Sequence, residues 1–372
     1  MKYLRFVKIA VLTLTILSQN ELQGQERWQT PKDPLPYRSL EVNYTVREDT
    51  SVHLAATLTL PEGKGPFKAI LIIGGSGQTS RNQPIYNHQM MFVLSDFLTR
   101  MGFAVLRFDD RGAGKSTAGT KKISQMTESD YLNDARAGIE FLKYQDQIDT
   151  DRIGIIGHSA GATQGLVLAA EKSNKIWFSI MLAGAVNNYP HMIVAQQSRL
   201  IAKASGWSRA MQTADSAFIA RSIGYTIGEL SSEKRLQEIK KVADEELQKL
   251  KPSEQDKLRK PFATRVNILS SEQFYAAAQQ KQEDHLLKVK CPVLVILGQN
   301  DLNVDPDYYG PKMQESLKRN FNPKSKLVVF PEVSHLMQSS KTGLFEEAKD
   351  IPETISIKVL DTISTWLSQF RD

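Results

Sequence analysis

From Lys68 onward, short apolar runs alternate with longer stretches whose apolar residues recur at helical spacing. This alternation is typical of β-α-β units, which build a parallel sheet with helices on both faces. Two runs of alternating apolar and polar residues, Leu40–Val46 and Ser51–Leu60, precede it and predict a further strand pair. The expected parallel strands are Ala69–Ile73, Ala104–Phe108, Ile153–Ile156, Phe178–Leu182, Val293–Leu297 and Leu327–Phe330, and the expected helices are Asn87–Arg100, Asp130–Tyr144, Thr163–Glu171, Asp307–Leu317 and Ile351–Phe370.

The interval Tyr189–Leu287 breaks this alternation, because it contains no run typical of a strand. A charged amphipathic segment within it, Ser232–Leu250, predicts a helix. A loop of this length without secondary structure is uncommon in a compact protein. We therefore expect a helical cap at residues 189–288, inserted between two parts of an α/β core at residues 25–188 and 289–372.

The N-terminus has the pattern of a secretory signal. Lys2, Arg5 and Lys8 precede the short apolar run Ile9–Leu17, and polar residues follow it. The run is about half the ~20 residues that a membrane-spanning helix needs. We expect residues 1–24 to be removed, leaving a periplasmic or extracellular chain with no stable membrane insertion; an N-terminal helix is the alternative.

Composition narrows the possible functions. The 41% hydrophobic and 24% charged residues are typical of a globular protein. The net charge of +6 comes from scattered Lys and Arg, which argues against a nucleic-acid partner. Cys291, the only cysteine, excludes an intramolecular disulfide and opens an apolar run, where burial is expected. No Cys/His pair has the spacing of metal ligands, so no metal is expected. We expect no cofactor either.

The sequence Gly-His-Ser-Ala-Gly at residues 157–161 lies between the predicted strand Ile153–Ile156 and a predicted helix. This is the context of a G-x-S-x-G nucleophile elbow, in which a sharp turn lifts the serine hydroxyl above the sheet. Ser159 is therefore the expected nucleophile. The Ala160 N–H, at the start of the helix, is the expected first oxyanion donor.

A serine hydroxyl is a weak nucleophile and needs a base within hydrogen-bond reach. In this type of fold the chain order is serine, acid, histidine, with the histidine after the last core strand. Only His335 satisfies this order, and His285 lies before the strand that should present the acid. The six histidines are His53, His88, His158, His191, His285 and His335.

The acid is expected just after the strand that ends at Leu297. Asp301 stands there and would accept the His335 ring N–H, which fixes the tautomer of the base. Asp305 and Asp307 are the competitors, although Asp305 precedes a proline and is typical of a turn.

A glycine-rich loop follows the strand that opens the core. Its backbone N–H groups at Gly75 and Ser76 are the expected second oxyanion donors, because glycines let such groups turn inward. Gly77 and His158 are the expected substrate contacts beside them, although the His158 ring should point away from the serine hydroxyl. A phosphate-binding loop is the rival interpretation, but no Lys-Ser/Thr pair follows.

Gly112–Ser116 ends like a second phosphate-binding loop. The first glycine of that motif should stand at position 109, where the chain has Asp109. Asp110–Gly112 is instead expected to form a turn after the Ala104–Phe108 strand, with Arg111 in a local ion pair.

Together these motifs resemble a family of bacterial α/β-hydrolase carboxylesterases with a helical cap and a serine aminopeptidase-like domain. The resemblance runs from about Leu40 to the C-terminus. It rests on Thr57–Pro61, on Gly75–Gly77 with Arg81, on Leu297-Gly298 with Asp301, and on His335-Leu336. The family's loop reads Gly-Ser-Gly-Pro-x-Asp-Arg, whereas this chain has Gln78 for the proline and Ser80 for the aspartate. The family's Pro-Trp-aromatic segment is replaced by Ser271–Tyr275.

The resemblance implies the α/β-hydrolase fold, a mostly parallel sheet with helices on both faces, and hydrolysis of small or short-chain carboxylic esters through an acyl-enzyme. Three alternatives stay open. A peptidase or aminopeptidase would need an anchor for a peptide terminus, for which Glu272 is the one weak candidate. A thioesterase is disfavoured because export would separate the enzyme from the thioesters of the cytosol. A binding module without catalysis is disfavoured because the Ser/Asp/His set is intact. The sequence leaves the oligomeric state open.

Overall fold

The computed structural model describes residues 27–121, 126–186, 206–271 and 284–370, together with residues 198, 202 and 275. The predicted signal segment lies outside these ranges. The chain divides into two compact units. The core unit comprises Met1–Val186, His285–Asp301 and Pro306–Asp372, and the helical unit comprises Asn187–Asp284 and Leu302–Asp305.

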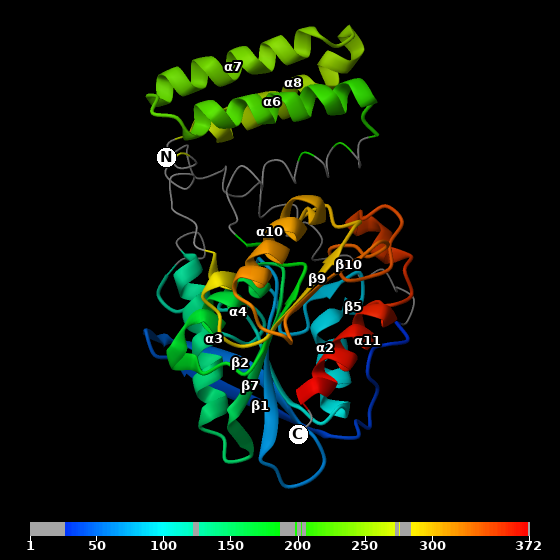
Figure 1. Ribbon diagram of the computed structural model, residues 1–372. Coiled ribbons are helices and arrows are strands. Elements are labelled where there is room, and N and C mark those ends of the chain that lie inside the picture. The colour runs from blue at the N-terminus through cyan, green and yellow to red at the C-terminus, as the bar shows by residue number, and fades with distance from the viewer. Residues whose placement is uncertain are drawn as a thin grey trace. The chain divides into compact units, whose positions relative to one another are not determined.

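An eight-stranded sheet forms the centre of the core unit (Figure 1). Its order is β1-β2-β6-β3-β7-β8-β9-β10. The first two strands pair antiparallel, β2 pairs antiparallel with β6, and all later pairs are parallel. The strands are β1 (Arg38–Val46), β2 (Asp49–Leu60), β3 (Phe67–Ile73), β6 (Ala104–Phe108), β7 (Ile148–His158), β8 (Ser179–Leu182), β9 (Val293–Gly298) and β10 (Lys326–Phe330).

Helices cover both faces of this sheet, since the parallel strands are apolar on both sides. On one face, α2 and α11 bury Leu94, Leu98 and Ile363 against Ile70 and Ile156 of the sheet. On the other face, α3 and α4 pack against β3 and β7, and α10 packs against β9 and β10. The helices are α2 (Met90–Arg100), α3 (Glu128–Lys143), α4 (Ala160–Ala170), α10 (Pro306–Arg319) and α11 (Ile357–Leu367). This arrangement confirms the predicted α/β-hydrolase fold.

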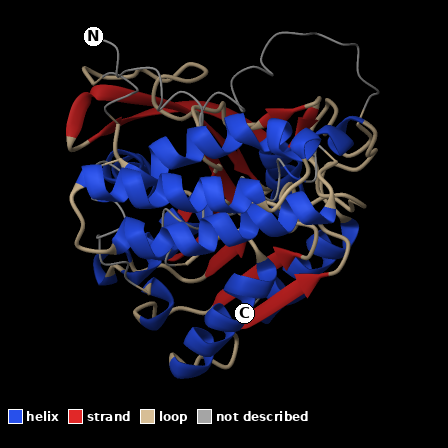
Figure 2. Cartoon of the chain, turned by 90° about the horizontal axis from the view of Figure 1, so that it is seen from above, coloured by secondary structure: helices blue, strands red, loops and turns tan. Residues whose placement is uncertain are grey.

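In the described part of the helical unit, three long helices lie side by side (Figure 2). They are α6 (Arg209–Ile227), α7 (Ser232–Gln248) and α8 (Pro252–Ser270). Ser208 and Ser231 cap the first two by accepting the N–H groups of Met211 and Lys234. Their shared interior includes the stacked rings of Phe218 and Phe262. Among the described helices, none combines the length and apolar character that crossing a bilayer demands.

Two helices begin later in the chain than the sequence predicts. α2 begins at Met90 rather than Asn87, because His88–Gln89 pairs with Pro84–Ile85 as a small hairpin, β5 with β4. α11 begins at Ile357 rather than Ile351. A proline disfavours helical backbone at the residue before it, and Pro352 follows Ile351 directly.

Candidate active site

Ser159 occupies the turn between the end of β7 and the start of α4. Its backbone has φ 54° and ψ −119°, a conformation that a residue with a side chain rarely adopts. The turn is tight, since a Cβ on Gly157 would collide with the backbone of Gly161, and a Cβ on Gly161 would collide with Gly74. The glycines on either side of the serine are therefore required by close backbone approach, as the elbow motif predicts.

The structure brings Ser159, His335 and Asp301 together from three separate loops of the core unit. His335 Nε2 lies 3.0 Å from Ser159 Oγ, and His335 Nδ1 lies 2.9 Å from Asp301 Oδ2. A carboxylate only accepts hydrogen bonds, so Nδ1 carries the ring proton and Nε2 is free to accept from the serine hydroxyl. Asp301 is 0% exposed and His335 is 6% exposed, while Ser159 is half-buried. The arrangement suits proton transfer from the serine to the histidine.

Two adjacent loops hold the acid and the base in place. Gly298 ends β9 against the Val333 carbonyl, where a Cβ would collide, and Asn300 N donates to the same carbonyl at 3.0 Å. Asp301 follows directly in a turn, with its N–H on the Gly298 carbonyl at 3.1 Å. The Asp301 loop is therefore tied to the segment that leads into His335. The competitor Asp307 is exposed at the start of α10, where it accepts from Gln299.

The glycine-rich loop after β3 lies beside the nucleophile: a Cβ on Gly75 would stand 3.5 Å from Ser159 Cβ. The Gly75 N–H already donates to Gln83 Oε1 at 3.2 Å, so it is not open to an oxyanion. The Ser76 N–H has no acceptor in the part of the chain that the structure describes, and Ser76 is exposed. The Ala160 N–H begins α4 and has no acceptor within the helix. Ala160 and Ser76 are thus the suitable pair of donors, and the placement speaks against Gly75.

The turn after β6 anchors the glycine-rich loop. In this loop, Gln78 and Ser80 replace the proline and the aspartate of the carboxylesterase family that the chain resembles. Gln78 donates to the Arg111 carbonyl at 2.8 Å. Arg81 forms an ion pair with Asp109 at 2.8 Å, in place of a partner within its own loop. Thr79 donates its N–H and its hydroxyl to Asp110 Oδ2, at 2.9 and 3.1 Å. Burial raises the pKa of Asp110 to about 7, although these two hydrogen bonds act to lower it.

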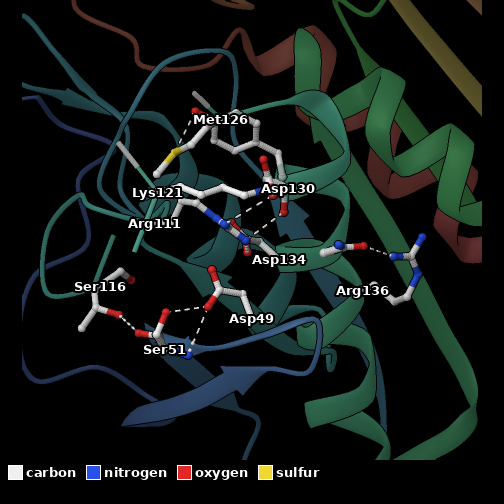
Figure 3. A network of polar contacts seen from close by, with 12 residues as sticks. Asp49, Ser51, Arg111, Ser116, Lys121, Met126, Asp130, Asp134 and Arg136 are labelled. Atoms are coloured by element: carbon white, nitrogen blue, oxygen red, sulfur yellow. Dashed lines mark hydrogen bonds and ion pairs between the residues drawn. The ribbon is translucent and has the colours of Figure 1, made fainter. Parts of the chain in front are cut away.

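Arg111 turns from the same segment into a buried ion pair (Figure 3). Its Nε donates to Asp134 of α3 at 2.7 Å, and its Nη2 reaches the Asp130 carbonyl at 3.1 Å. Lys121 binds the Asp130 carboxylate at 2.6 Å. Arg111 therefore forms an ion pair as predicted, but its partner Asp134 lies on α3, 23 residues further along the chain, and not within the local turn. The Gly112–Ser116 segment follows as a turn whose Lys115 N–H donates to Asp109 Oδ2 at 2.9 Å.

His158 is buried beneath the site, at 2% exposure, rather than open to it. Its Nε2 lies 2.8 Å from the His335 carbonyl and its Nδ1 lies 3.4 Å from Gln83 Nε2. Burial lowers the pKa of His158 to about 4, and the nearby His335 adds to this effect. The ring is therefore neutral at physiological pH. Its placement agrees with the expected packing role and speaks against a direct contact with substrate. Gly77 has a φ of 106°, which favours glycine. Its role as a substrate contact stays a prediction.

The low pKa of His158 predicts a loss of stability in acid. An unfolded histidine has a pKa near 6.5, so the unfolded state binds a proton first as the pH falls. Above about pH 6.5, His158 does not lower the free energy of unfolding. As the pH falls from there towards about 4, this free energy decreases by about 3 kcal/mol. Urea unfolding of the native chain and of His158→Gln at pH 7 and pH 4 measures this difference. Equal acid losses in the two proteins would contradict the prediction.

Cys291 is half-buried, and burial raises the pKa of its thiol to about 12. A protonated thiol is a poor nucleophile, so the residue does not compete with Ser159. Within the described residues, no three His, Cys, Asp or Glu side chains gather as a metal site would require.

The comparisons with known proteins identify the family of the chain. Residues 87–340 match the family described as serine aminopeptidase, S33, and the chain belongs to that family, within the predicted superfamily. It is 22% identical over 325 residues to the esterase EstD of Thermotoga maritima, covering 84% of this chain and 65% of that protein. It is 29% identical over 111 residues to the 2,6-dihydropseudooxynicotine hydrolase of Paenarthrobacter nicotinovorans, covering 30% of this chain and 27% of that protein. The chain thus spans less than two thirds of the length of either relative.

Among solved structures, the Pyrococcus furiosus esterase Pf2001 is similar in fold. The two chains share 20% sequence identity, with a TM-score of 0.53, and the match covers 93% of this chain and 95% of the other. This similarity concerns the fold alone.

Proposed function

We propose that the protein is a serine hydrolase that cleaves small carboxylic esters through an acyl-enzyme on Ser159. The observation that carries the proposal is the continuous hydrogen-bond chain from the Ser159 hydroxyl through His335 to Asp301. Such a chain lets one histidine act first as base and then as acid. No other described side chain is needed for the proton transfers.

The first step forms the acyl-enzyme. Ser159 Oγ attacks the ester carbonyl as its proton passes to His335 Nε2, and Asp301 stabilises the resulting imidazolium. The N–H groups of Ala160 and Ser76 hold the negative oxygen of the tetrahedral intermediate. When that intermediate collapses, the ester C–O bond breaks and His335 gives its proton to the leaving alcohol.

The second step releases the acid. Water takes the place of the alcohol, passes a proton to His335 Nε2 and attacks the acyl carbon. Collapse of this second intermediate breaks the bond to Ser159 Oγ, which recovers its proton from the histidine. The reaction requires no cofactor.

The preference for esters rests on relatives rather than on geometry. EstD is named an esterase and is 22% identical to this chain over 325 residues, and the chain itself resembles carboxylesterases. The family description names an aminopeptidase, so a peptidase is the second candidate. Glu272, which the sequence suggests as an anchor for a peptide amine, lies outside the described residues. That the helical unit acts as a cap and limits the size of the acyl group stays a prediction.

A substrate panel tests this choice. The full chain is offered nitrophenyl esters of acetate, butyrate and octanoate, and nitroanilides of several amino acids, with Ser159→Ala as the control for each. We expect kcat/KM to be highest on the acetate or butyrate ester and to vanish in the variant. A preference for the anilides would establish the peptidase instead. Hydrolysis that survives in Ser159→Ala, or no hydrolysis of either class, would reject the acyl-enzyme proposal.

We also propose that the protein is exported, on the strength of the N-terminal pattern. N-terminal sequencing of the product recovered from the periplasm or medium of a bacterial host tests this. A cytoplasmic product that retains Lys2 would reject it.

A further inference from the structure

Gln83 lies at the far end of the loop that begins at Gly74, and the sequence motifs did not single it out. Its side chain is 8% exposed. Its backbone φ is 48°, a left-handed conformation that costs energy in a residue with a side chain. A buried amide held in this way must satisfy two donors and an acceptor within the protein. The groups around it show how it does so.

Its two ends face different parts of the site. Oε1 accepts the Gly75 N–H at 3.2 Å, and Nε2 lies 3.4 Å from His158 Nδ1. On the far side of the imidazole, His158 Nε2 lies 2.8 Å from the His335 carbonyl. A single line of contacts therefore runs from the oxyanion loop, through the residue before the nucleophile, to the backbone of the base.

The direction of every hydrogen bond in this line is fixed. A backbone N–H can only donate, so the Gln83 oxygen must face Gly75 and its NH₂ group must face His158. A carbonyl can only accept, so His158 Nε2 must carry the ring proton that bonds His335. Nδ1 is then left with the lone pair that the Gln83 NH₂ group requires. The four groups fit one protonation state, and this state is the neutral imidazole that burial favours.

We propose that Gln83 is a positioning residue, which holds the oxyanion loop, the nucleophile elbow and the His335 backbone in register through Gly75 and His158. The proposal rests on the hydrolase function above and deepens it. Gln83 touches no reacting atom. It acts by occupying the Gly75 N–H, which leaves the neighbouring Ser76 N–H as the loop's oxyanion donor, and by setting where His335 stands relative to Ser159.

A glutamine that merely filled space would not depend on the polarity of its two ends. Gln83→Met keeps the length of the side chain and removes both hydrogen bonds. Gln83→Glu keeps the acceptor for Gly75 and places a second acceptor against the Nδ1 lone pair. A proton must then enter the contact between the new carboxyl group and Nδ1. We expect it on His158, as an imidazolium paired with the carboxylate near neutral pH.

The experiment records long-range ¹H–¹⁵N spectra of the full chain labelled in histidine, at neutral pH. In the native protein we expect His158 as the Nε2–H tautomer, with a hydrogen-bonded Nδ1. In Gln83→Met the Nδ1 signal should move to the position of an unbonded ring nitrogen, and in Gln83→Glu His158 should be doubly protonated. Gln78→Met, a matched change in the same loop, should leave the His158 signals where they are.

The kinetic readout is the ester hydrolysis of the native chain and of Gln83→Met. We expect kcat to fall about 10- to 100-fold with KM nearly unchanged, because a small misplacement of catalytic groups slows the chemistry more than binding. An Nδ1–H tautomer of native His158, or His158 signals that ignore both Gln83 variants, would overturn the proposal. A rise in KM at constant kcat would overturn it as well.

The spectrum of the native protein can be recorded whether or not the protein hydrolyses the esters and whether or not the variants fold. The Nδ1 signal of native His158, hydrogen-bonded or not, therefore tests the Gln83 contact even if the ester panel fails. A failed panel with a hydrogen-bonded Nδ1 would count against the hydrolase function alone.

Discussion

Replacing Ser159 with alanine should lower kcat by about 10⁶-fold, the scale on which loss of a serine nucleophile acts in a triad of this kind. The hydroxyl supplies the oxygen that bonds the acyl carbon, and no other described nucleophile stands within reach of His335 Nε2. The side chain is half-buried and its removal leaves the core intact, so the unfolding midpoint should hold within about 2 °C. Initial rates on the best ester of the panel measure the effect.

The matched test is His335→Ala, alone and combined with Ser159→Ala. Residues that act as one unit are not additive, so the double variant should be no slower than either single one. A residual rate in Ser159→Ala within about a hundredfold of native, or losses that multiply in the double variant, would show that the two side chains do not share one reaction.

Replacing Asp301 with asparagine should lower kcat by about 10⁴-fold while the fold is retained. The carboxylate oxygen accepts the His335 Nδ1 proton at 2.9 Å. An amide NH₂ group turned toward Nδ1 would favour the opposite tautomer, whose Nε2–H cannot accept the serine proton. Steady-state rates, with the unfolding midpoint as a check on structure, measure the loss.

Asp307→Asn is the control for this change, since Asp307 is close in sequence, exposed, and bonded to Gln299 rather than to His335. Its kcat should stay within about twofold of native, as for surface substitutions away from the site. Comparable activity in Asp301→Asn and Asp307→Asn, or a larger loss in the latter, would mean that the acid has been assigned to the wrong residue.

The arrangement of the core could be predicted because its signals are local. Each parallel strand is a short run that is apolar on both faces, so runs such as Ala104–Phe108 stand out against helical spacing. The motif around Ser159 predicts a tight turn, because only small residues fit on either side of it. His335 and Asp301 could be named from chain order, because parallel strands bring their carboxyl ends to one edge of the sheet.

The support of the site could not be predicted in the same way. The buried partner of Arg81 is Asp109, which lies 28 residues further along the chain, and the sequence offers no periodicity that joins them. Gln83 reaches Gly75 only because the loop between them folds back, and no pattern marks a loop residue as buried. For the same reason the sequence predicts Gly75 as a free donor, whereas its N–H is occupied by Gln83 in the folded chain.

The covalent intermediate is the central claim, and a fluorophosphonate tests it most directly, because it phosphonylates only a serine whose base and oxyanion donors are in place. The intact chain is treated with the probe, digested, and mapped by mass spectrometry. We expect one adduct, on the peptide that carries Ser159, and a much slower adduct in Asp301→Asn. An adduct on a different serine, or an unmodified chain under conditions that keep the fold, would contradict the account.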